Sequence, residues 1–392
     1  MLAGRWVVLI ALFIARFCLG FQFQSVGSVS PMLMGDLQLD HLSIGLLIGL
    51  FMLPGVVLAF PLTVLTASIG DRQVVLLGLT LTVIGGVFAS ISDSFAVLAL
   101  GRLVSGAGAA LLLVVLTKIM IDQFSNHDLF WGMSIFIIGW PVGIAAGQAT
   151  QAALADLTNW RIVFVATSIA CLLSFVATSN LYRGPRDPSS GAATITTGIS
   201  GSELWLINIA GLIWMLLNGA YVTVLTFAPA YLVEQGISIV EAGAIVSGMS
   251  WVFILALPLG GYVTSRYLSP NVVILIGLGG ATLIGLSVPF AGHPLLTFAL
   301  FGMALSFATP VVATLPAEVL RSENRALGLG IYFTWFFAGV SVLPILGGAL
   351  ADHTGTTAAS LLLGVMMLGL CVGLVGFFRW EARRLRATIA AA

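Results

Sequence analysis

Residues 97–121 read VLALGRLVSGAGAALLLVVLTKIMI, and only Arg102 and Lys118 in this run carry charge. The hydrocarbon core of a bilayer is about 30 Å thick, so a helix needs roughly 20 apolar residues to cross it. A membrane-spanning β-strand would have about ten residues of alternating polarity, and this run does not alternate. The stretch therefore predicts an α-helix that crosses a membrane.

The whole chain shares this composition. Of its 392 residues 59% are hydrophobic and only 8% are charged, and the mean hydropathy is +1.12. A soluble protein carries about a quarter charged residues, so the composition excludes a soluble globule. The net charge is zero, which leaves no basic footprint for a nucleic acid. Cys18, Cys171 and Cys371 lie far apart in apolar runs, which excludes a disulfide scaffold and a clustered cysteine metal site. We also expect no other metal and no cofactor.

Breaks at charged residues and at Pro, Gly and Asn clusters divide the chain into twelve apolar runs. They lie near residues 5–30, 42–66, 73–92, 97–121, 130–153, 161–182, 204–230, 239–263, 271–291, 295–316, 326–350 and 357–379. The sequence therefore predicts an all-α membrane protein with twelve transmembrane helices.

Basic residues indicate how these helices are oriented. With a cytoplasmic N-terminus, only Arg161 falls on the far face, and eleven Arg residues fall on cytoplasmic ends and loops. The eleven are Arg5, Arg72, Arg183, Arg186, Arg266, Arg321, Arg325, Arg379, Arg383, Arg384 and Arg386. Because cytoplasmic loops are enriched in Lys and Arg, we expect a multi-pass protein of the cell (inner) membrane with both termini in the cytoplasm.

One long polar stretch interrupts the runs near the middle of the chain. Residues 183–202 read RGPRDPSSGAATITTGISGS, a composition typical of a flexible linker. We therefore expect an N-terminal six-helix bundle at residues 1–182, a cytoplasmic linker at 183–202 and a C-terminal six-helix bundle at 203–392.

The two halves are related in sequence. Ala153-Leu154-Ala155-Asp156 recurs as Ala349-Leu350-Ala351-Asp352, at an offset of 196. Gly143 meets Gly339 at the same offset, and Ser30-Pro31 resembles Ala228-Pro229 at an offset of 198. Parallel repeats of this kind form two pseudo-symmetric bundles with a binding site near the midplane between them.

Several motifs resemble those of the major facilitator superfamily. Arg102 followed by Gly106 and Gly108 looks like the family's buried Arg and glycine stripe. Gly139-Trp140-Pro141-Val142-Gly143 is similar to the Gly-Pro motif of its fifth helix. The loop before the third run carries Gly70, Asp71 and Arg72, which match the family's Gly-rich charged loop. The resemblance implies the family's twelve-helix fold and structural or gating roles for these residues, Pro141 included. Residues 21–31, FQFQSVGSVSP, resemble the cyanate and nitroimidazole branch.

Three basic residues lie inside the predicted spans, where a charge costs at least about 2.5 kcal/mol. Arg16 lies about 16 Å along the first span, close to the midplane. Gly20, Phe23 and Gly27 share its helix face, and Gln24 lies beside it. Such a stripe is typical of a cavity wall and predicts substrate contact. The alternative is that Arg16 extends toward the cytoplasm or bonds helix-end carbonyls.

The other two intramembrane cations have structural alternatives of at least equal weight. Arg102 either hydrogen-bonds to neighbouring helices or contacts substrate or protons. Lys118 lies four residues before Asp122, and an (i, i+4) ion pair at the water boundary explains it. A substrate contact is the other reading of Lys118.

No acidic residue lies near the centre of a predicted span; Glu241 and Glu318 are near span ends. A cation transporter needs buried negative charge, and a proton pump usually needs an intramembrane carboxylate relay. The sequence therefore favours an anionic substrate, because Arg offers a planar fork to carboxylate-like groups.

Uncharged side chains are expected to complete the site. Trp214, Asn218 and Tyr221 share one face of the seventh span, and Tyr332 and Trp335 share one face of the eleventh. The candidate substrate-binding residues are thus Arg16, Gln24, Lys118, Trp140, Trp214, Asn218, Tyr221, Tyr332 and Trp335. Packing and the membrane interface are alternative roles for the aromatic residues, and helix–helix hydrogen bonding is the alternative for Asn218.

These features predict a secondary transporter that moves a small anionic or polar solute by alternating access. The alternative is a multidrug efflux transporter of the same superfamily. An enzyme is not expected, because no catalytic cluster lies at membrane depth, and no GxxxxGK[ST] pattern for ATP is present. The expected partners are a small solute and the lipid bilayer, and we expect a monomer.

Glycines are expected to mediate the motion. The chain has 45, many of them along the fourth, fifth and eleventh spans, and small residues let helices approach closely. We expect Gly106, Gly143 and Gly339 to line helix contacts that rearrange between inward- and outward-open states.

The predicted orientation is testable with single cysteines at Ser190 and Gln235 in a chain without its native cysteines. A membrane-impermeant maleimide should label residue 235 from outside the cell and residue 190 only from the cytoplasm. Labelling of residue 190 from the outside only, or of residue 235 from the inside only, would overturn the topology.

Overall fold

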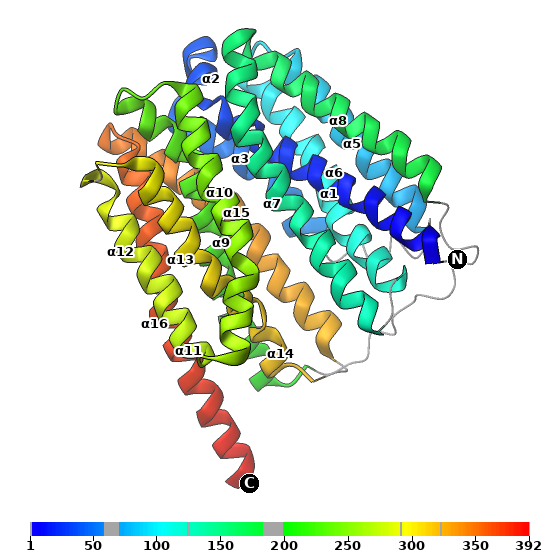
Figure 1. Ribbon diagram of the computed structural model, residues 1–392, viewed down its shortest axis with the longest axis vertical. Coiled ribbons are helices and arrows are strands. Elements are labelled where there is room, and N and C mark those ends of the chain that lie inside the picture. Colours follow the sequence, from blue (N-terminus) through cyan, green and yellow to red (C-terminus); the bar gives the residue numbers. More distant parts are fainter. Residues whose placement is uncertain are drawn as a thin grey trace.

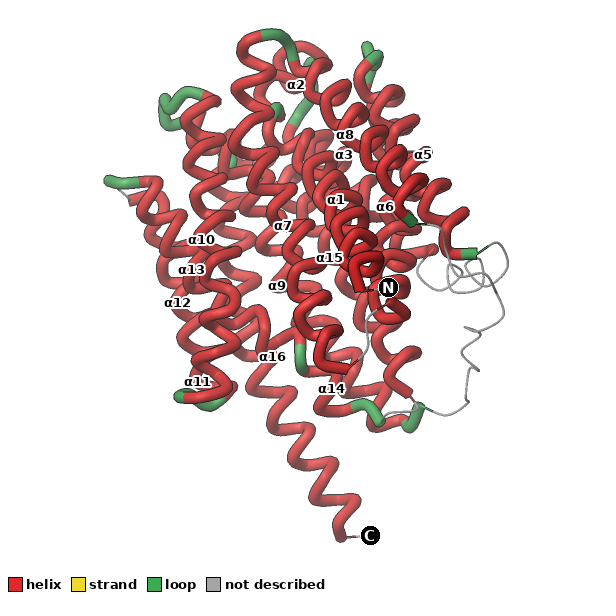
Figure 2. The backbone as a smooth tube through the Cα atoms, turned by 45° about the vertical axis from the view of Figure 1, so that its right-hand side comes forward, coloured by secondary structure: helices red, strands yellow, loops and turns green. Residues whose placement is uncertain are grey.

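A computed structural model of the chain describes residues 2–58, 70–123, 126–182, 199–290, 292–321 and 324–391. Within these ranges the chain forms helices joined by short loops, with no β-strand. Figures 1 and 2 show the long helices side by side in one bundle. The prediction of an all-α protein is confirmed.

The first half contributes six long helices and one short one. They are α1 (Leu2–Ser28), the short α2 (Ser30–Leu37), α3 (His41–Leu58), α5 (Asp71–Ser90), α6 (Phe95–Gln123), α7 (Asn126–Leu157) and α8 (Trp160–Leu181). The end of the second predicted span falls in residues 59–69, outside the described residues. Most of the predicted linker, residues 183–198, lies outside them too.

The second half begins with α9 (Gly201–Glu234) and α10 (Ile239–Arg266). The ninth span is composite, with α11 (Pro270–Ile274), the π-helical turn η2 (Leu275–Gly279), α12 (Gly280–Ser287) and the 3₁₀ turn η3 (Val288–Phe290). It is followed by α13 (Pro294–Ala313), α14 (Leu315–Val319), α15 (Arg325–Thr354) and α16 (Ala358–Ala391).

Eleven segments of the described chain are long and apolar enough to cross a membrane. The 32-residue α7 packs along α1 and α10 in the same bundle and makes a twelfth. Successive long helices run antiparallel, so their ends gather at two opposite ends of the bundle. We call one the linker end, because Tyr182 and Ile199 flank residues 183–198 there. The opposite one, where α3 begins, is the His41 end.

Two boundaries differ from the sequence prediction. The first predicted span, 5–30, is broken at Val29, and α2 starts anew with Pro31 in its first turn, a position that proline favours. In the second half α9 continues past the matching Pro229. The last helix runs to Ala391, beyond the predicted end at 379, and extends past the bundle (Figure 1).

The glycines predicted to line helix contacts do so, but within the halves. A Cβ on Gly106 would overlap the carbonyl oxygen of Phe51, and one on Gly143 would overlap that of Phe17. A Cβ on Gly339 would stand 2.5 Å from the Met215 carbonyl oxygen. Gly108 approaches Gly78 of α5 in the same way. We therefore expect these contacts to persist while the halves move, so the moving contacts must lie elsewhere.

Arg102 ties three helices of the first half together. It is 1% exposed, and its Nε donates to the Leu47 carbonyl of α3 at 3.0 Å. Its Nη atoms donate to the carbonyls of Gln22 and Phe23 on α1, at 3.1 and 3.2 Å. The guanidinium lies 4.3 Å from the centre of the Phe51 ring. These contacts favour the structural alternative for Arg102 over substrate contact.

Arg102→Met should lower the free energy of unfolding by about 2–4 kcal/mol, because several charge-assisted hydrogen bonds are lost in the core. The apparent Tm of the purified protein measures this. Arg161→Met is the control, because its pair with the exposed Asp93 lies at the surface and is worth about 0–1 kcal/mol. Equal Tm values for the two variants would contradict the structural role of Arg102.

Candidate substrate-binding site

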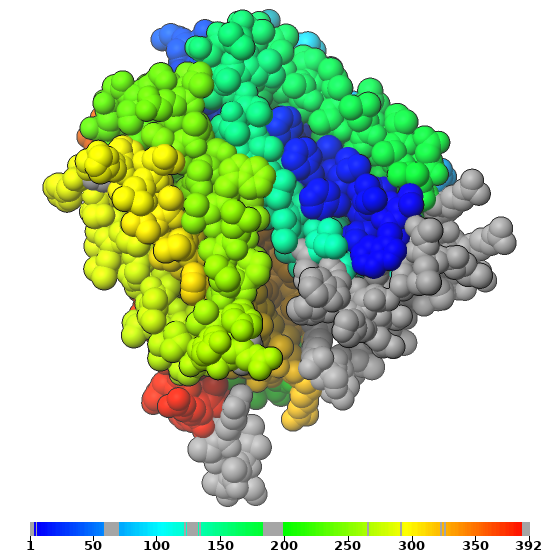
Figure 3. Space-filling view, in the orientation of Figure 1, coloured from blue at the N-terminus to red at the C-terminus, as the bar shows by residue number. Residues whose placement is uncertain are grey.

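A hollow separates the two halves on the side of the linker end. Figure 3 shows it between α10, in yellow-green, and α1 and α7, in blue and teal, with the orange α15 at its back. Toward the His41 end the halves close on each other, where α3 packs along α15 and α7 packs along α10. The structure is therefore open at the linker end and shut at the His41 end.

Arg16 lies between α1 and α7, half-buried near the middle of the bundle. Its guanidinium sits 4.5 Å from the centre of the Phe136 ring. The Nε atom is buried and has no hydrogen-bond partner. No Asp or Glu of the described chain forms an ion pair with it. Arg16 is thus a cation at membrane depth that a ring face balances only in part.

The glycine face of α1 is a helix contact and not an open cavity wall, which corrects the expectation for this stripe. A Cβ on Gly20 would overlap the carbonyl oxygen of Trp140 on α7. On the other side of the contact, a Cβ on Gly139 would stand 3.1 Å from the Phe13 carbonyl and 3.3 Å from the Arg16 Cβ. The close fit of α1 on α7 is what holds Arg16 in place.

A chain of buried amides leads from Gln24 into the second half. Gln148 on α7 donates from Nε2 to Gln24 Oε1 at 3.5 Å, and its Oε1 accepts from Ser250 Oγ on α10 at 2.6 Å. Gln24 is 3% exposed, and its Nε2 has no hydrogen-bond partner. Tyr221 on α9 lies beside Ser250 without a well-formed hydrogen bond at its hydroxyl. These buried side chains therefore join α1 and α7 of the first half to α10 of the second.

Gln148, Gln151 and Ser250 are further candidate residues that were not predicted from the sequence. Gln151 donates from Nε2 to the Phe21 carbonyl at 2.7 Å, while its Oε1 has no partner. The signal was present, since the two glutamines lie three residues apart in an apolar span and so share a helix face. A buried amide must find partners, which makes each one a candidate for contact between helices or with a solute.

Aromatic candidates of the second half pack on one another in pairs. Trp214 stacks on Tyr332 with centroids 5.6 Å apart, and the Trp214 Nε1 is buried with no hydrogen-bond partner. Tyr221 stacks on Phe253 at 5.0 Å. Asn218 donates to the Trp214 carbonyl of its own helix at 2.9 Å, so its amide nitrogen bonds within α9 and not to another helix.

Three further aromatic candidates have identified partners. The Trp335 Nε1 donates to Asn208 Oδ1 at 2.9 Å, and the Tyr332 hydroxyl donates to the Val312 carbonyl at 3.1 Å. Trp140 packs against Phe23 with centroids 5.5 Å apart, one residue before Pro141 in α7. These contacts fix the positions of the three rings within the helix packing.

Lys118 lies apart from this group, at the linker end. Its Nζ forms an ion pair with Asp71 Oδ1 at 2.7 Å, a partner on α5 that the sequence spacing did not predict. The side chain of Asp122, the predicted partner, lies outside the described residues. Arg72 donates to the carbonyls of Ser179 and Tyr182 at 3.0 and 3.1 Å. Gly70 has φ = 86°, a left-handed conformation that glycine adopts freely. The loop therefore ties α5 to α6 and α8.

The unpartnered atoms of the site are mainly hydrogen-bond donors. Arg16 Nε, Gln24 Nε2 and Trp214 Nε1 can only donate, and the Tyr221 hydroxyl can donate too. Such a set suits a solute rich in acceptors. Among the described residues, no group of His, Cys, Asp or Glu is placed to hold a metal ion.

Comparison with known proteins decides the family. The family model of the Major Facilitator Superfamily matches residues 12–301 and 213–392, which together cover almost the whole chain. The chain belongs to the major facilitator superfamily. It is therefore a multi-pass membrane transporter that moves a small-molecule solute, and the twelve-helix fold in two pseudo-symmetric bundles is confirmed.

Curated relatives include proteins with different named substrates. A gallate transporter of Pseudomonas putida is 34% identical over 171 residues, which cover 42% of this chain and 38% of that one. An uncharacterised transporter of Bacillus subtilis is 22% identical, with 96% of each chain covered. A chloramphenicol efflux pump of Mycobacterium tuberculosis is 23% identical, with 88% and 87% covered.

Solved structures share the fold. A bacterial homologue of the human lysosomal transporter Spinster, in an inward-facing and unoccupied conformation, superposes with a TM-score of 0.76 at 18% identity, over 97% of each chain. A transporter of the POT family in complex with 5-aminolevulinic acid gives 0.77 at 14% identity, over 95% of this chain and 96% of that one. At these identities the likeness concerns the fold alone.

Gly143→Leu should abolish transport while leaving membrane insertion intact, because its side chain would push α1 from α7 and displace Arg16. Overpacking of this kind typically costs about 1–3 kcal/mol, so the Tm should fall as well. Solute uptake and the Tm are the measurements. Gly376→Leu is the control, since a Cβ there meets nothing within 4 Å. Normal turnover of Gly143→Leu would contradict the role of this contact.

Proposed function

We propose that this transporter moves a small organic anion by alternating access, with Arg16 as the main recognition residue. The observation that carries the proposal is the state of Arg16, a half-buried cation with an unpartnered Nε and no ion pair among the described residues. A charge at this depth is costly unless something compensates it. A carboxylate fits, because it accepts two parallel hydrogen bonds from a guanidinium.

An aromatic carboxylate is the favoured class of anion. Stacked rings at Trp214 and Tyr332, together with Trp140, offer apolar faces to a planar substrate. The unpartnered donors at Gln24, Trp214 and Tyr221 suit ring hydroxyls or further carboxylate oxygens. The likeness to a gallate transporter points the same way. The resemblance of residues 21–31 to the cyanate and nitroimidazole branch adds a second class of small solute to test.

In alternating access the open end of the hollow faces one side of the membrane, and the charge pattern supports the cytoplasmic side. The structure is open at the linker end, and the eleven Arg residues of the positive-inside pattern support a cytoplasmic linker end. The protein would then lie in the inner membrane with both termini in the cytoplasm, and the structure would represent its inward-open state. Residues 1–182 and 203–392 would be the rocking halves of a monomer.

Drug efflux is the second candidate, favoured by the likeness to a chloramphenicol efflux pump and by the stacked aromatic pairs. The two functions make different demands on Arg16. Binding of an uncharged drug should survive loss of this charge, whereas binding of an anion should not.

Gallate, benzoate, cyanate and chloramphenicol should be screened by thermal shift of the purified protein, since a ligand that binds only the native state raises the apparent Tm. For the anion that binds, Arg16→Ala should weaken affinity at least about 30-fold. Arg16→Lys should weaken it about tenfold, because charge remains but the two-pronged geometry is lost. Isothermal titration of protein with an unchanged elution profile measures both effects.

Lys118→Gln is the matched control. It removes a cation of the same half, but one that is paired with Asp71 at the linker end, so anion affinity should stay within about twofold of the parent. If Arg16→Ala binds the anion as tightly as the parent, Arg16 is structural and the anion assignment is lost. Binding of chloramphenicol alone, unaffected by Arg16→Ala, would favour efflux instead.

A further inference from the structure

The seam between α3 and α15 is made of backbone against backbone. A Cβ on Gly45 or Gly49 of α3 would overlap the carbonyl oxygen of Pro344 or Ser341 on α15. In return, a Cβ on Gly348 of α15 would overlap the carbonyl oxygen of His41. This contact joins the two halves over several helical turns below the His41 end. In the proposed cycle, it must part whenever the His41 end opens.

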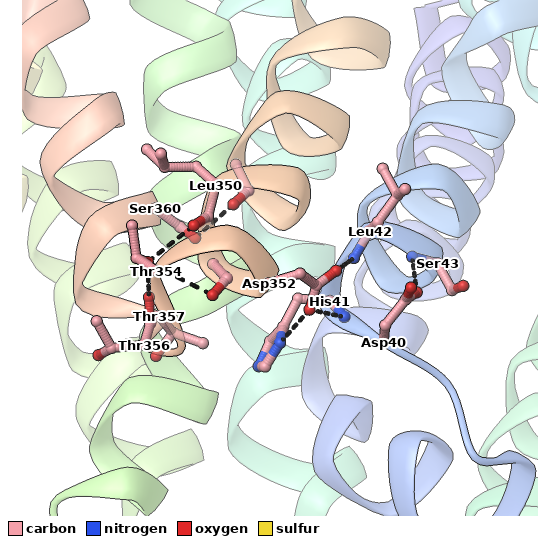
Figure 4. A network of polar contacts seen from close by, with 12 residues as sticks. Asp40, His41, Leu42, Ser43, Leu350, Asp352, Thr354, Thr356, Thr357 and Ser360 are labelled. Carbon is pink, nitrogen blue, oxygen red and sulfur yellow. Dashed lines mark hydrogen bonds and ion pairs between the residues drawn. The ribbon is translucent and has the colours of Figure 1, made fainter.

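One side chain at the top of this seam bonds across it. Asp352, in the last turn of α15, accepts from the backbone N–H groups of His41 and Leu42 at 2.9 and 2.7 Å. Its Oδ1 also lies 2.8 Å from His41 Nδ1 (Figure 4). The first N–H groups of a helix have no partner within the helix, and its N-terminus attracts negative charge. Asp352 therefore caps α3 from the other half.

The cap on α3 is shared between the halves. Asp40, which precedes the helix, accepts from the Ser43 N–H at 2.8 Å (Figure 4). It does not reach the His41 and Leu42 N–H groups that Asp352 takes. When the seam parts, the hydrogen bonds between these two N–H groups and the Asp352 carboxylate break, and water must replace them. The hydrogen bonds of Asp352 therefore stabilise only the state that is shut at the His41 end.

The Ala-Leu-Ala-Asp stretch that ends at Asp352 has a counterpart in the first half, but the aspartate of that counterpart caps no helix of the described chain. Asp156 ends the matching Ala-Leu-Ala-Asp stretch in α7, which packs along α10 as α15 packs along α3. Asp156 is exposed and makes no hydrogen bond or ion pair with the described residues. The N-terminus of α10 is capped by its own Ser238, which accepts from the Glu241 N–H at 3.2 Å. Only one of the two seams is held by its aspartate.

We propose that Asp352 is the positioning residue that keeps the His41 end shut, and that its bonds to His41 and Leu42 set the balance between the two states. The proposal rests on alternating access as proposed above, but not on the identity of the solute. Asp156, its sequence counterpart, has no share in this balance. The asymmetry makes the α3–α15 seam, and not the α7–α10 seam, the one whose strength decides how often the His41 end opens.

The test measures opening through the reactivity of a buried thiol. Ser341, 1% exposed and in contact with Gly49, is replaced by Cys in a chain that lacks Cys18 and Cys171 but keeps Cys371. Protein in nanodiscs is treated with a water-soluble maleimide, and the rates at residues 341 and 371 are followed by mass spectrometry. Cys371 is fully buried in the second half, at 0% exposed, so its reactivity reports unfolding rather than opening.

Asp352→Asn should raise the labelling rate at residue 341 at least tenfold and leave the rate at Cys371 unchanged. His41→Ala should give a smaller rise, because the two backbone bonds to Asp352 remain. Asp156→Asn is the matched control and should label like the parent. An unchanged rate in Asp352→Asn, or an equal rise in Asp156→Asn, overturns the proposal.

A parallel rise at Cys371 would mean that Asp352 serves the stability of the fold and not the balance of states, and this also overturns the proposal. Because labelling needs no substrate, failure here leaves the anion assignment untouched. Conversely, loss of the anion assignment through the Arg16 variants leaves this test intact.

Discussion

The first half is organised by a buried cation that has no carboxylate to pair with. The guanidinium of Arg102 is satisfied by main-chain carbonyls of α1 and α3 and by the face of Phe51. Because it grips α1 at Gln22 and Phe23, it fixes the height and rotation of that helix relative to α6. Arg16 and Gln24 lie within two turns of the grip, so the shape of the solute site depends on it. A carboxylate partner would have satisfied the charge but fixed no backbone.

Much of the fold could be predicted from the sequence, because length and apolarity alone are enough to identify membrane-spanning helices. The break at Val29 could not, since the similar Pro229 lies inside a continuous helix in the second half. Proline tolerates both the first turn of a helix and a kinked interior, and tertiary packing decides between them. The π-helical turn at Leu275–Gly279 likewise follows a shift in hydrogen-bond register that has no clear residue signature.

The site was predicted less completely, for reasons that lie in tertiary structure. The depth of Arg16 follows from counting along its helix, but its neighbour Phe136 comes from α7 and has no signal in the spacing. Lys118 has an ion-pair partner that its own spacing could not indicate, because Asp71 comes from α5, 47 residues earlier in the chain. The amides Gln148 and Gln151 were visible as polar residues in an apolar span, yet only the fold shows which helix each one faces.

The glycine seams also bear on how such a protein changes over evolutionary time. Where α3 meets α15, glycines bring main-chain atoms of the two halves into contact, so this part of the fit requires Gly45, Gly49 and Gly348 but no particular side chain around the hollow. The candidate site residues are other positions, most of them on α1, α7, α9 and α10. They can be replaced one by one without altering the α3–α15 seam about which the halves move. Because the contact between the halves is made largely by main-chain atoms, the residues that recognise the solute can change independently of it. One scaffold can thus acquire new solutes by substitution at the hollow alone.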